Sequence, residues 1–376
     1  MKRLSLTPRP DWREHVERDL GFAFHTIDGL PYWDETACYA FDADEIDGIE
    51  EVTAEIEQTA LELVDRVVAA GEPAYRELRI PPAAWEAIEG SWRAGAKNLY
   101  GRFDFSYGGD APPKLLEYNA DTPTALFEAA VVQWDWLESL MPDRDQFNSI
   151  HERLIDAWRN FGIRRGPVHF SAVKGHIEDG GTVEYLRDTA VQAGLDTVRI
   201  DVEDIGWDGT GFVDLDNRPI ATLFKLYPWE WLVAEEFGGH LLSGVADVIE
   251  PPWKMVLSNK AVLALLWDMA PGHPNLLQTA FEPGAIEGEV FEKPIFGREG
   301  ANVRLAANGQ VLAETAGPYG AEGFVYQAAA PLPAFDGRYP VLGSWVVASQ
   351  PAGMGIREDE TAITGDNSRF IPHYFE

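Results

Sequence analysis

Four polar side chains between residues 102 and 119 have the types and spacing to bind a metal ion together with a phosphate. Arg102 and Asp104 lie two residues apart, and so do Glu117 and Asn119. Because side chains alternate between the two faces of a β-strand, each pair would share one face of its strand. Carboxylate and amide oxygens suit Mg²⁺, and a guanidinium beside them suits a charged oxygen that develops during a reaction. The pattern therefore favours a site for Mg²⁺ and a nucleotide.

The residues between these two pairs predict the turn that would bring the pairs together. Gly108, Gly109 and Asp110 come just before two prolines, a composition that is typical of a turn. The second strand can then return beside the first, with the four polar side chains on one face. The same pattern is also consistent with a half-buried hairpin whose polar face is only solvated, and this segment alone leaves both interpretations open.

Thr122 and Pro123 follow the second expected strand and predict the start of a helix. Threonine is a favoured N-cap residue, and proline is favoured at the first helical position. Phe127, Val131 and Trp134 would lie along this helix. Its N-terminus would favour an anionic substrate group beside the four polar residues.

The whole chain predicts mixed α and β structure, α+β or α/β, in three consecutive parts of one domain, residues 1–376. We expect residues 1–98 to be mainly helical, residues 99–250 to alternate strands with helices, and residues 251–376 to form short antiparallel strands after one helix. The expected strands after the hairpin are 168–173, 197–200, 220–226, 290–295, 302–305, 323–327 and 341–347, and expected helices begin near Ile46, Pro82, Val183 and Asn259.

The composition narrows the classes of partner. Thirty Lys+Arg against 62 Asp+Glu give a net charge of −32, which repels nucleic acid and attracts cationic ligands, although such acidity also serves solubility. No apolar run approaches the ~20 residues of a membrane span, and the start of the chain lacks a signal-peptide core. We therefore expect a cytoplasmic protein with no nucleic-acid or membrane partner. Cys38 is the only cysteine, so an intrachain disulfide is excluded.

The few lysines are concentrated in one part of the chain. Four of the eight lie within a window of 69 residues, from Lys225 to Lys293. In an acidic, lysine-poor protein, this concentration predicts cations that bind phosphate. Lys225 is followed by an aromatic segment in which Glu230 is a candidate contact for an amine.

Several short motifs, taken in order, resemble those of the glutathionylspermidine synthase family, in its ATP-dependent synthetase part. They are residues 102–104, 116–124, 259–261, 293–302 and 326–327, with a looser match from Gly355 onward. Their order and separation agree with that family over most of the chain. The resemblance implies an ATP-grasp-like fold in which a C-terminal antiparallel sheet clamps the nucleotide.

The resemblance also implies roles for individual residues. Asp104, Glu117 and Asn119 match the magnesium ligands, and Arg102 matches the catalytic arginine. The expected ATP contacts are Lys260, Lys293, Gly297, Arg298, Gly300, Tyr326, Gln327 and Arg357. Within this set, residues 297–300 would form a flexible loop over the phosphates, and Tyr326 and Gln327 would lie beside adenine. Thr122 and Thr124 match hydroxyl positions on the acyl-substrate side.

The reaction that the resemblance implies is the ligation of a carboxylate to an amine. ATP with Mg²⁺ would convert the carboxylate into an acyl phosphate, which the amine would capture as an amide. The substrates would be small molecules, such as glutathione or another peptide and a polyamine. The family's bifunctional members carry an amidase domain, for which this chain has no room before the first motif. Threonine at 122 and 124, where bacterial bifunctional enzymes have serine, leaves the acyl donor open. A nucleotide-binding protein without catalysis and a small-molecule kinase are the alternatives.

Overall fold

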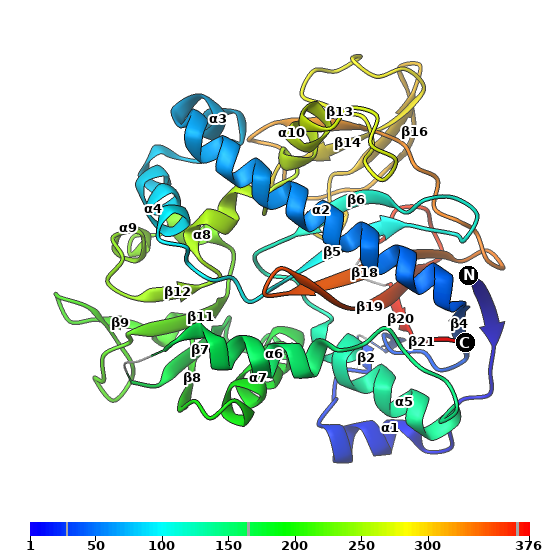
Figure 1. The fold of residues 1–376 in the computed structure, drawn as a ribbon, viewed down its shortest axis with the longest axis horizontal. Helices are drawn as coiled ribbons and strands as arrows, with labels where there is room; N and C mark the ends of the chain where they lie inside the picture. The colour runs from blue at the N-terminus through cyan, green and yellow to red at the C-terminus, as the bar shows by residue number, and fades with distance from the viewer. Residues whose placement is uncertain (28, 164–165, 366–367) are drawn as a thin grey trace.

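A five-stranded antiparallel sheet lies at the centre of the molecule, with the strand order β20-β19-β18-β5-β6 (Figure 1). The structure is a computed structural model and describes residues 1–376 except 28, 164–165 and 366–367. The strands of this central sheet are β5 (Tyr100–Ser106), β6 (Lys114–Asn119), β18 (Tyr339–Val347), β19 (Gln350–Asp359) and β20 (Arg369–Ile371). The hairpin β5–β6 that the sequence predicts therefore forms one edge of a larger sheet.

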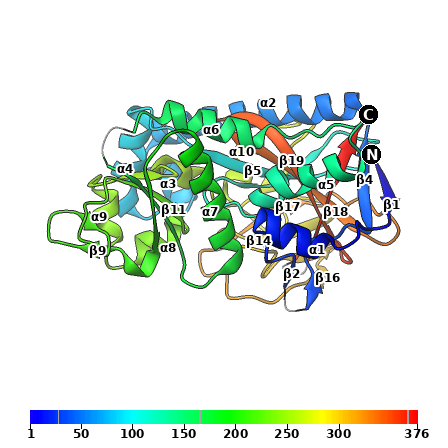
Figure 2. The same ribbon diagram turned by 90° about the horizontal axis from the view of Figure 1, so that it is seen from below.

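The long helix α2 (Ala43–Ala70) covers one face of the central sheet (Figures 1 and 2). The helix predicted near Ile46 is confirmed, and Ile46, Ile49 and Ile56 are buried in the same core as Phe103 and Phe105 of β5. These two phenylalanines face α2, so the side chains that alternate with them on β5 face away from the helix. The hairpin's polar residues consequently lie on the opposite face, which α2 leaves open.

A four-stranded parallel sheet with the order β12-β11-β7-β8 confirms the predicted α/β pattern in the middle of the chain. Its strands are β7 (Val168–Ala172), β8 (Thr197–Asp201), β11 (Thr222–Leu226) and β12 (Asp247–Ile249), and the helices α6 (Ile150–Phe161) and α7 (Ile177–Gln192) contact each other beside it. Helix α7 begins six residues before the predicted start at Val183, and this extension places its first turn near the polar face of the hairpin.

A second antiparallel sheet, ordered β13-β17-β14-β15-β16, follows helix α10 (Val262–Met269). It consists of β13 (Thr279–Ala280), β14 (Glu289–Pro294), β15 (Arg304–Ala307), β16 (Gln310–Glu314) and β17 (Phe324–Ala328). The expectation that residues 341–347 join this sheet is wrong, because β18 pairs with β5 in the central sheet. Nearly all of β18 is buried, so its apolar run does not indicate which strand will be its neighbour.

The N-terminal part contains the expected helices and also strands that the sequence did not predict. Helices α3 (Glu72–Glu77) and α4 (Pro82–Arg93) follow α2. A three-stranded sheet, ordered β1-β4-β21, joins β1 (Lys2–Ser5) and β4 (Ala37–Phe41) to β21 (His373–Phe375), so the two chain ends lie near each other (Figure 1). The remaining elements are α1 (Trp12–His15), η1 (Val16–Leu20), β2 (Thr26–Ile27), β3 (Leu30–Pro31), η2 (Glu128–Val132), α5 (Gln133–Leu140), η3 (Val202–Asp204), β9 (Gly206–Trp207), β10 (Phe212–Val213), α8 (Trp229–Ala234), α9 (Gly238–Leu242) and η4 (Pro252–Val256). Among the helices that the structure describes, none has the length and apolar character needed to cross a membrane.

A buried carboxylate, Glu250, fixes the start of β5. It accepts hydrogen bonds from the backbone N–H groups of Leu99 and Tyr100, each at 3.0 Å, and Lys254 Nζ lies 3.7 Å away. Lys254 also donates to the carbonyl of Tyr100 at 3.1 Å. Burial raises the pKa of Glu250 to about 7, although the charge of Lys254 acts in the opposite direction. The ionised carboxylate is therefore costly at this position.

We predict that Glu250→Gln changes how stability depends on pH. The pKa of Glu250 is raised from 4.5 to about 7 in the folded protein. Its contribution to the free energy of unfolding is therefore greatest below pH 4.5 and falls as the pH rises from 4.5 to about 7. The free energy of unfolding of the wild type should therefore fall relative to the variant by at most about 1.4 kcal/mol per pH unit in the window. Denaturant titrations from pH 4.5 to 8 measure the difference. Parallel curves for the two proteins would show that Glu250 does not titrate there.

Candidate functional site

The four polar residues of the hairpin converge as the sequence predicts. Strands β5 and β6 are antiparallel, with Arg102 opposite Asn119 and Asp104 opposite Glu117. A register shift follows directly after Asp104 and separates this polar part of the hairpin from the end near the turn. The two carboxylates are therefore cross-strand neighbours on the face that α2 leaves open.

Asp104 binds two guanidinium groups that come from different strands. Arg102 on β5 donates from Nε and Nη2 at 2.6 and 3.0 Å, and Arg357 on β19 donates from Nη2 at 2.9 Å. Gly343 on β18 leaves room for Arg102, because a Cβ at this position would lie 2.8 Å from Arg102 Cδ. Burial disfavours the charged form of Arg102, but Asp104 outweighs this effect and raises its pKa. Both arginines are thus held in place as cations.

Glu117 lies between Asn119 and two lysines. Asn119 Nδ2 donates to Glu117 at 3.2 Å and to Asp104 at 3.3 Å, and Lys260 Nζ lies 2.9 Å from Glu117 Oε2. Removal from solvent by itself raises the pKa of Glu117, but the charges of Lys260 and Lys293 together hold it well below its ordinary value. Glu117 is consequently a carboxylate at neutral pH, as a metal ligand must be.

Lys293 on β14 is held by the second antiparallel sheet and by the hairpin. Its Nζ donates to the side chain of Gln327 at 2.6 Å and to the carbonyl of Leu116 at 3.0 Å. Burial lowers the pKa of Lys293 to about 8, while the charge of Glu117 favours the protonated form. Gln327 thus positions a lysine, and its Nε2 donates to the carbonyl of Leu115 at 3.3 Å.

The loop at residues 297–300 lies against the hairpin in this structure. Arg298 donates to the hydroxyl of Thr122 at 3.0 Å and to Glu230 at 2.6 Å. Lys260 donates to the carbonyl of Gly297 at 2.6 Å. Gly300 has a φ of +68° and approaches the backbone of Thr364 so closely that a Cβ would lie 2.5 Å from its carbonyl oxygen. The loop is therefore closed onto the site here, and its predicted flexibility stays a prediction.

The predicted helix start at Thr122 and Pro123 is wrong. Residues 122–125 are not helical, and the helical segment begins at Leu126. Ala125 has a φ of 65°, which breaks a helical path, and the carbonyl of Thr124 accepts from Arg102 Nη1 at 2.7 Å. The threonine hydroxyl that we expected to cap a helix instead contacts Arg298.

A cavity of about 620 Å³ lies over the polar face of the hairpin. Predicted site residues that line it are Arg102, Asp104, Glu117, Asn119, Thr122, Thr124, Lys260, Lys293, Gly297, Arg298, Gly300 and Arg357. Glu230 reaches the site through Arg298, and Gln327 reaches it through Lys293. Tyr326 does not belong to the lining that the structure describes, because it alternates with Gln327 on β17 and points to the other face of that strand.

The structure adds polar residues that sequence reasoning missed, and four of them bear on the chemistry. Tyr32, His176, Glu178 and Asp179 line the same cavity. The last three lie at the start of α7, where His176 Nδ1 accepts from the backbone N–H of Asp179 at 3.3 Å. Burial raises the pKa of Asp179, and the charge of Glu178 adds to this effect. Two acidic residues in a first helical turn were a visible signal, but they also suit an ordinary helix start.

The donor set of the hairpin fits Mg²⁺. Asp104, Glu117 and Asn119 supply only oxygen ligands to a metal, and Asn119 lies within hydrogen-bond distance of both carboxylates. Asn119 presents Nδ2 to both carboxylates here, so rotation of its amide would turn Oδ1 toward a cation. Among the described residues, no group of three or more His, Cys, Asp or Glu side chains is arranged to hold a metal.

Only two of the four clustered lysines are in the site. Lys260 and Lys293 line the cavity, as expected for phosphate contacts. Lys225 is buried against Asp121, with 2.7 Å between Nζ and Oδ1, and Lys254 is buried beside Glu250. The lysine window therefore combines cavity residues with core ion pairs, which composition alone could not separate.

Comparisons with known proteins agree with this geometry. A family model described as "Glutathionylspermidine synthase preATP-grasp" matches residues 3–376. The chain is 44% identical over 398 residues to a Haemophilus influenzae protein with the provisional name acid–amine ligase, and the match covers 100% of both chains. It is 30% identical to trypanothione synthetase of Crithidia fasciculata, over 78% of this chain and 50% of that protein. It is 28% identical to the bifunctional glutathionylspermidine synthetase/amidase of Escherichia coli, over 78% and 52% respectively.

The chain thus spans about half the length of the last two enzymes. Among solved structures, a glutathione synthetase-like effector from Globodera pallida matches with a TM-score of 0.55 and 12% identity, covering 90% of this chain and 88% of that one. At this low identity the likeness concerns the fold alone. It supports a mixed α/β architecture of the glutathione-synthetase kind.

The geometry predicts that nucleotide and metal stabilise the protein together through Glu117. Wild-type protein should melt at a higher temperature with Mg²⁺ and ATP than with either alone, because ligands that bind only the native state stabilise it. Glu117→Ala should lose most of this shift. Asp110→Ala is a matched control, since Asp110 is an exposed carboxylate in the turn of the same hairpin. An equal shift in Glu117→Ala and wild type would remove Glu117 from the metal site.

Proposed function

Because the chain belongs to the glutathionylspermidine synthase family, we propose that it is an ATP- and Mg²⁺-dependent ligase that joins a carboxylate to an amine. The reaction would pass through an acyl phosphate and form an amide. One observation carries the proposal: a single cavity combines cations suited to phosphate with acidic residues suited to an amine.

The cations belong to several structural elements around the hairpin. Lys260 precedes α10, Lys293 is on β14, and Arg298 is in the loop that follows β14. Lys293 and Arg298 are fixed by neutral or anionic groups of the protein, so their positive charge is held in place before a substrate arrives. Such preorganised charge stabilises a triphosphate and the charge that develops as its γ-phosphoryl group transfers.

In this proposal, Arg102 and Arg357 would act at the reacting carboxyl group. Asp104 orients both guanidinium groups, and Thr124 orients Arg102 further through its carbonyl. Mg²⁺ held by Asp104, Glu117 and Asn119 would neutralise phosphate charge during the transfer. A planar guanidinium can bind two oxygens at once, which suits an acyl phosphate better than a point charge does.

The acidic side of the cavity suits the amine substrate. Glu178 and Asp179 lie at the start of α7, and Glu230 lies behind Arg298. A chain with a net charge of −32 would also attract a polycation. Glutathione and spermidine are therefore the first pair of substrates to test, with other peptides and polyamines next.

The test is ADP release in the presence of separate carboxylate and amine substrates. A ligase releases ADP rapidly only when both are present, with about one amide formed per ADP. A kinase forms ADP when only one of the two substrates is present. A protein that only binds nucleotide forms no ADP with either substrate. Mass spectrometry of the products identifies the amide. If no pair from a panel of peptides and polyamines gives an amide, while ATP still binds, the ligase proposal is refuted.

We predict that Arg102→Ala lowers turnover by at least about 10² and changes ATP affinity little, because its work is done in the transition state. Arg102→Lys should also be poor, since an ammonium lacks the planar fork. Arg304→Ala, which removes an exposed arginine from β15, is the control. Steady-state kinetics and nucleotide titration separate the two effects. Equal losses of binding and turnover would make Arg102 a ground-state phosphate ligand.

A further inference from the structure

Glu128 is a buried carboxylate that is only half satisfied. It lies in η2 and is fully buried, and the hydroxyl of Tyr32 donates to its Oε1 at 2.6 Å. Its other oxygen, Oε2, is buried without a hydrogen-bond partner among the described residues. A buried carboxyl group with an unsatisfied oxygen destabilises the folded protein, so its presence calls for an explanation other than stability. Glutamine or an apolar residue would be less costly at this position.

Tyr32 connects this carboxylate to the cavity. Tyr32 is buried, and it lines the cavity together with Arg102, Thr124 and Glu178. The electrostatic effects on Tyr32 include those of Glu178, which is on the acidic side, and Arg357, which contacts Asp104. Tyr32 thus shares one cavity with residues of both the proposed amine side and the proposed acyl side.

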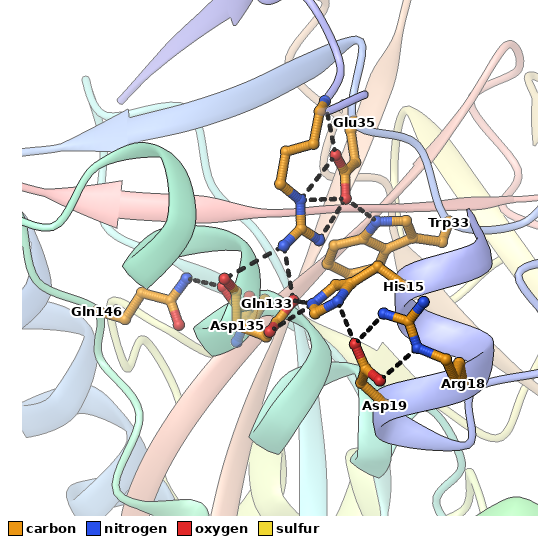
Figure 3. Close-up of polar contacts among 9 residues, drawn as sticks. His15, Arg18, Asp19, Trp33, Glu35, Gln133, Asp135 and Gln146 are labelled. Atoms are coloured by element: carbon orange, nitrogen blue, oxygen red, sulfur yellow. Dashed lines mark hydrogen bonds and ion pairs between the residues drawn. The ribbon is translucent and has the colours of Figure 1, made fainter. Parts of the chain in front are cut away.

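A network centred on Arg9 links Glu35 to Asp135 of helix α5 (Figure 3). Arg9 Nη2 donates to Glu35 at 2.7 Å, and Arg9 Nη1 donates to Asp135 at 2.6 Å. Glu35 also accepts from the indole N–H of Trp33, the residue after Tyr32, at 3.1 Å. Asp135 is in α5, which continues η2. Arg9 therefore ties the segment of Tyr32 to the helix of Glu128.

We propose that Tyr32 and Glu128 form a relay that accepts a proton from the amine substrate as it attacks the acyl phosphate. The proposal rests on the ligase function argued above. Tyr32 would touch the amine, and Glu128 would act through Tyr32 as the final proton acceptor. An alkyl ammonium cannot attack, because its nitrogen has no free electron pair, and its pKa resembles that of lysine, so it needs such an acceptor at neutral pH.

The step balances in protons and charge. One N–H proton of the ammonium passes to Tyr32 Oη as the tyrosine proton passes to Glu128 Oε1, so Tyr32 stays neutral and Glu128 becomes a carboxylic acid. The freed amine then forms the C–N bond, and the C–O bond to phosphate breaks with its electron pair. A second N–H proton leaves with the phosphate, which departs as hydrogen phosphate. Glu128 returns its proton to solvent through Tyr32 when the products leave.

The electrostatic surroundings make Glu128 a suitable base. Burial, and then the charge of Glu178, raise the pKa of Glu128 to about 8, while Arg102 and the hydrogen bond from Tyr32 act in the opposite direction. The amine cation would enter on the side where Glu178 lies. A carboxylate with a raised pKa accepts a proton more readily than an ordinary one, as general base catalysis near neutral pH requires.

The experiment compares spermidine with hydroxylamine as acceptor of the glutathionyl acyl phosphate. Hydroxylamine is largely unprotonated near neutral pH and needs no base to free its electron pair. In Tyr32→Phe and Glu128→Gln, we expect spermidine-dependent turnover to fall by at least about 10², and hydroxamate formation to stay within about threefold of wild type. Wild-type turnover with spermidine should rise with pH and level off near pH 8, where Glu128 is ionised. The residual turnover of Glu128→Gln should instead keep rising above pH 8, because it depends on free amine, whose pKa resembles that of lysine.

Tyr39→Phe is the matched control, because Tyr39 is another buried tyrosine whose hydroxyl donates to a glutamate, Glu358, at 2.7 Å. It should leave both reactions unchanged. Equal losses with both acceptors in Tyr32→Phe and Glu128→Gln would mean a structural role, and full activity with spermidine would mean no role, so either result overturns the relay. If the wild type forms neither hydroxamate nor amide from any carboxylate tested, the ligase function itself fails.

Discussion

Asp104 receives guanidinium groups from Arg102 on β5 and from Arg357 on β19, two strands separated in the sheet by β18. This shared carboxylate is the contact on which the rest of the site depends. It brings two cations close together in a poorly hydrated place, where they would otherwise repel each other. Gly343, on the intervening strand, makes the contact possible because any larger residue would collide with Arg102. The backbone of the central sheet thus determines how the two guanidinium groups are oriented.

The other parts of the site are arranged around this pair according to charge. The second antiparallel sheet contributes Lys293, whose position depends on Gln327, and the first turn of α7 contributes Glu178 and Asp179. Each cation of the site is paired with an oxygen of the protein, so in the proposed function its position would already be fixed when phosphate arrives. If the proposed function is right, acidic groups on one side and cations on the other would hold the amine apart from ATP until the acyl phosphate has formed.

Sequence reasoning reached the local features and missed those that depend on distant contacts. The hairpin of Asp104 and Glu117 was predictable, because its alternation and turn are encoded within residues 102–119. The neighbours of β18 were not, since a strand buried on both faces can pair with many others. Tyr32 gave no signal, because its importance comes from Glu128, which lies 96 positions later. Thr122 misled us, since its hydroxyl has a tertiary partner in Arg298 that outweighs its preference for a helix cap.

The return of the last strands to the first ones has a consequence for how the protein folds during synthesis. Strand β18 lies between β5 and β19, and β21 pairs with β4, so early strands wait for partners that are made more than 200 residues later. Contacts of such long range form slowly, and unpaired edges invite aggregation in the meantime. Asp104 would also lack its ion pair with Arg357 until β19 has been synthesised. We expect a nascent chain that lacks β18 to β21 to depend on chaperones, and to gain its active geometry only in the final step of folding.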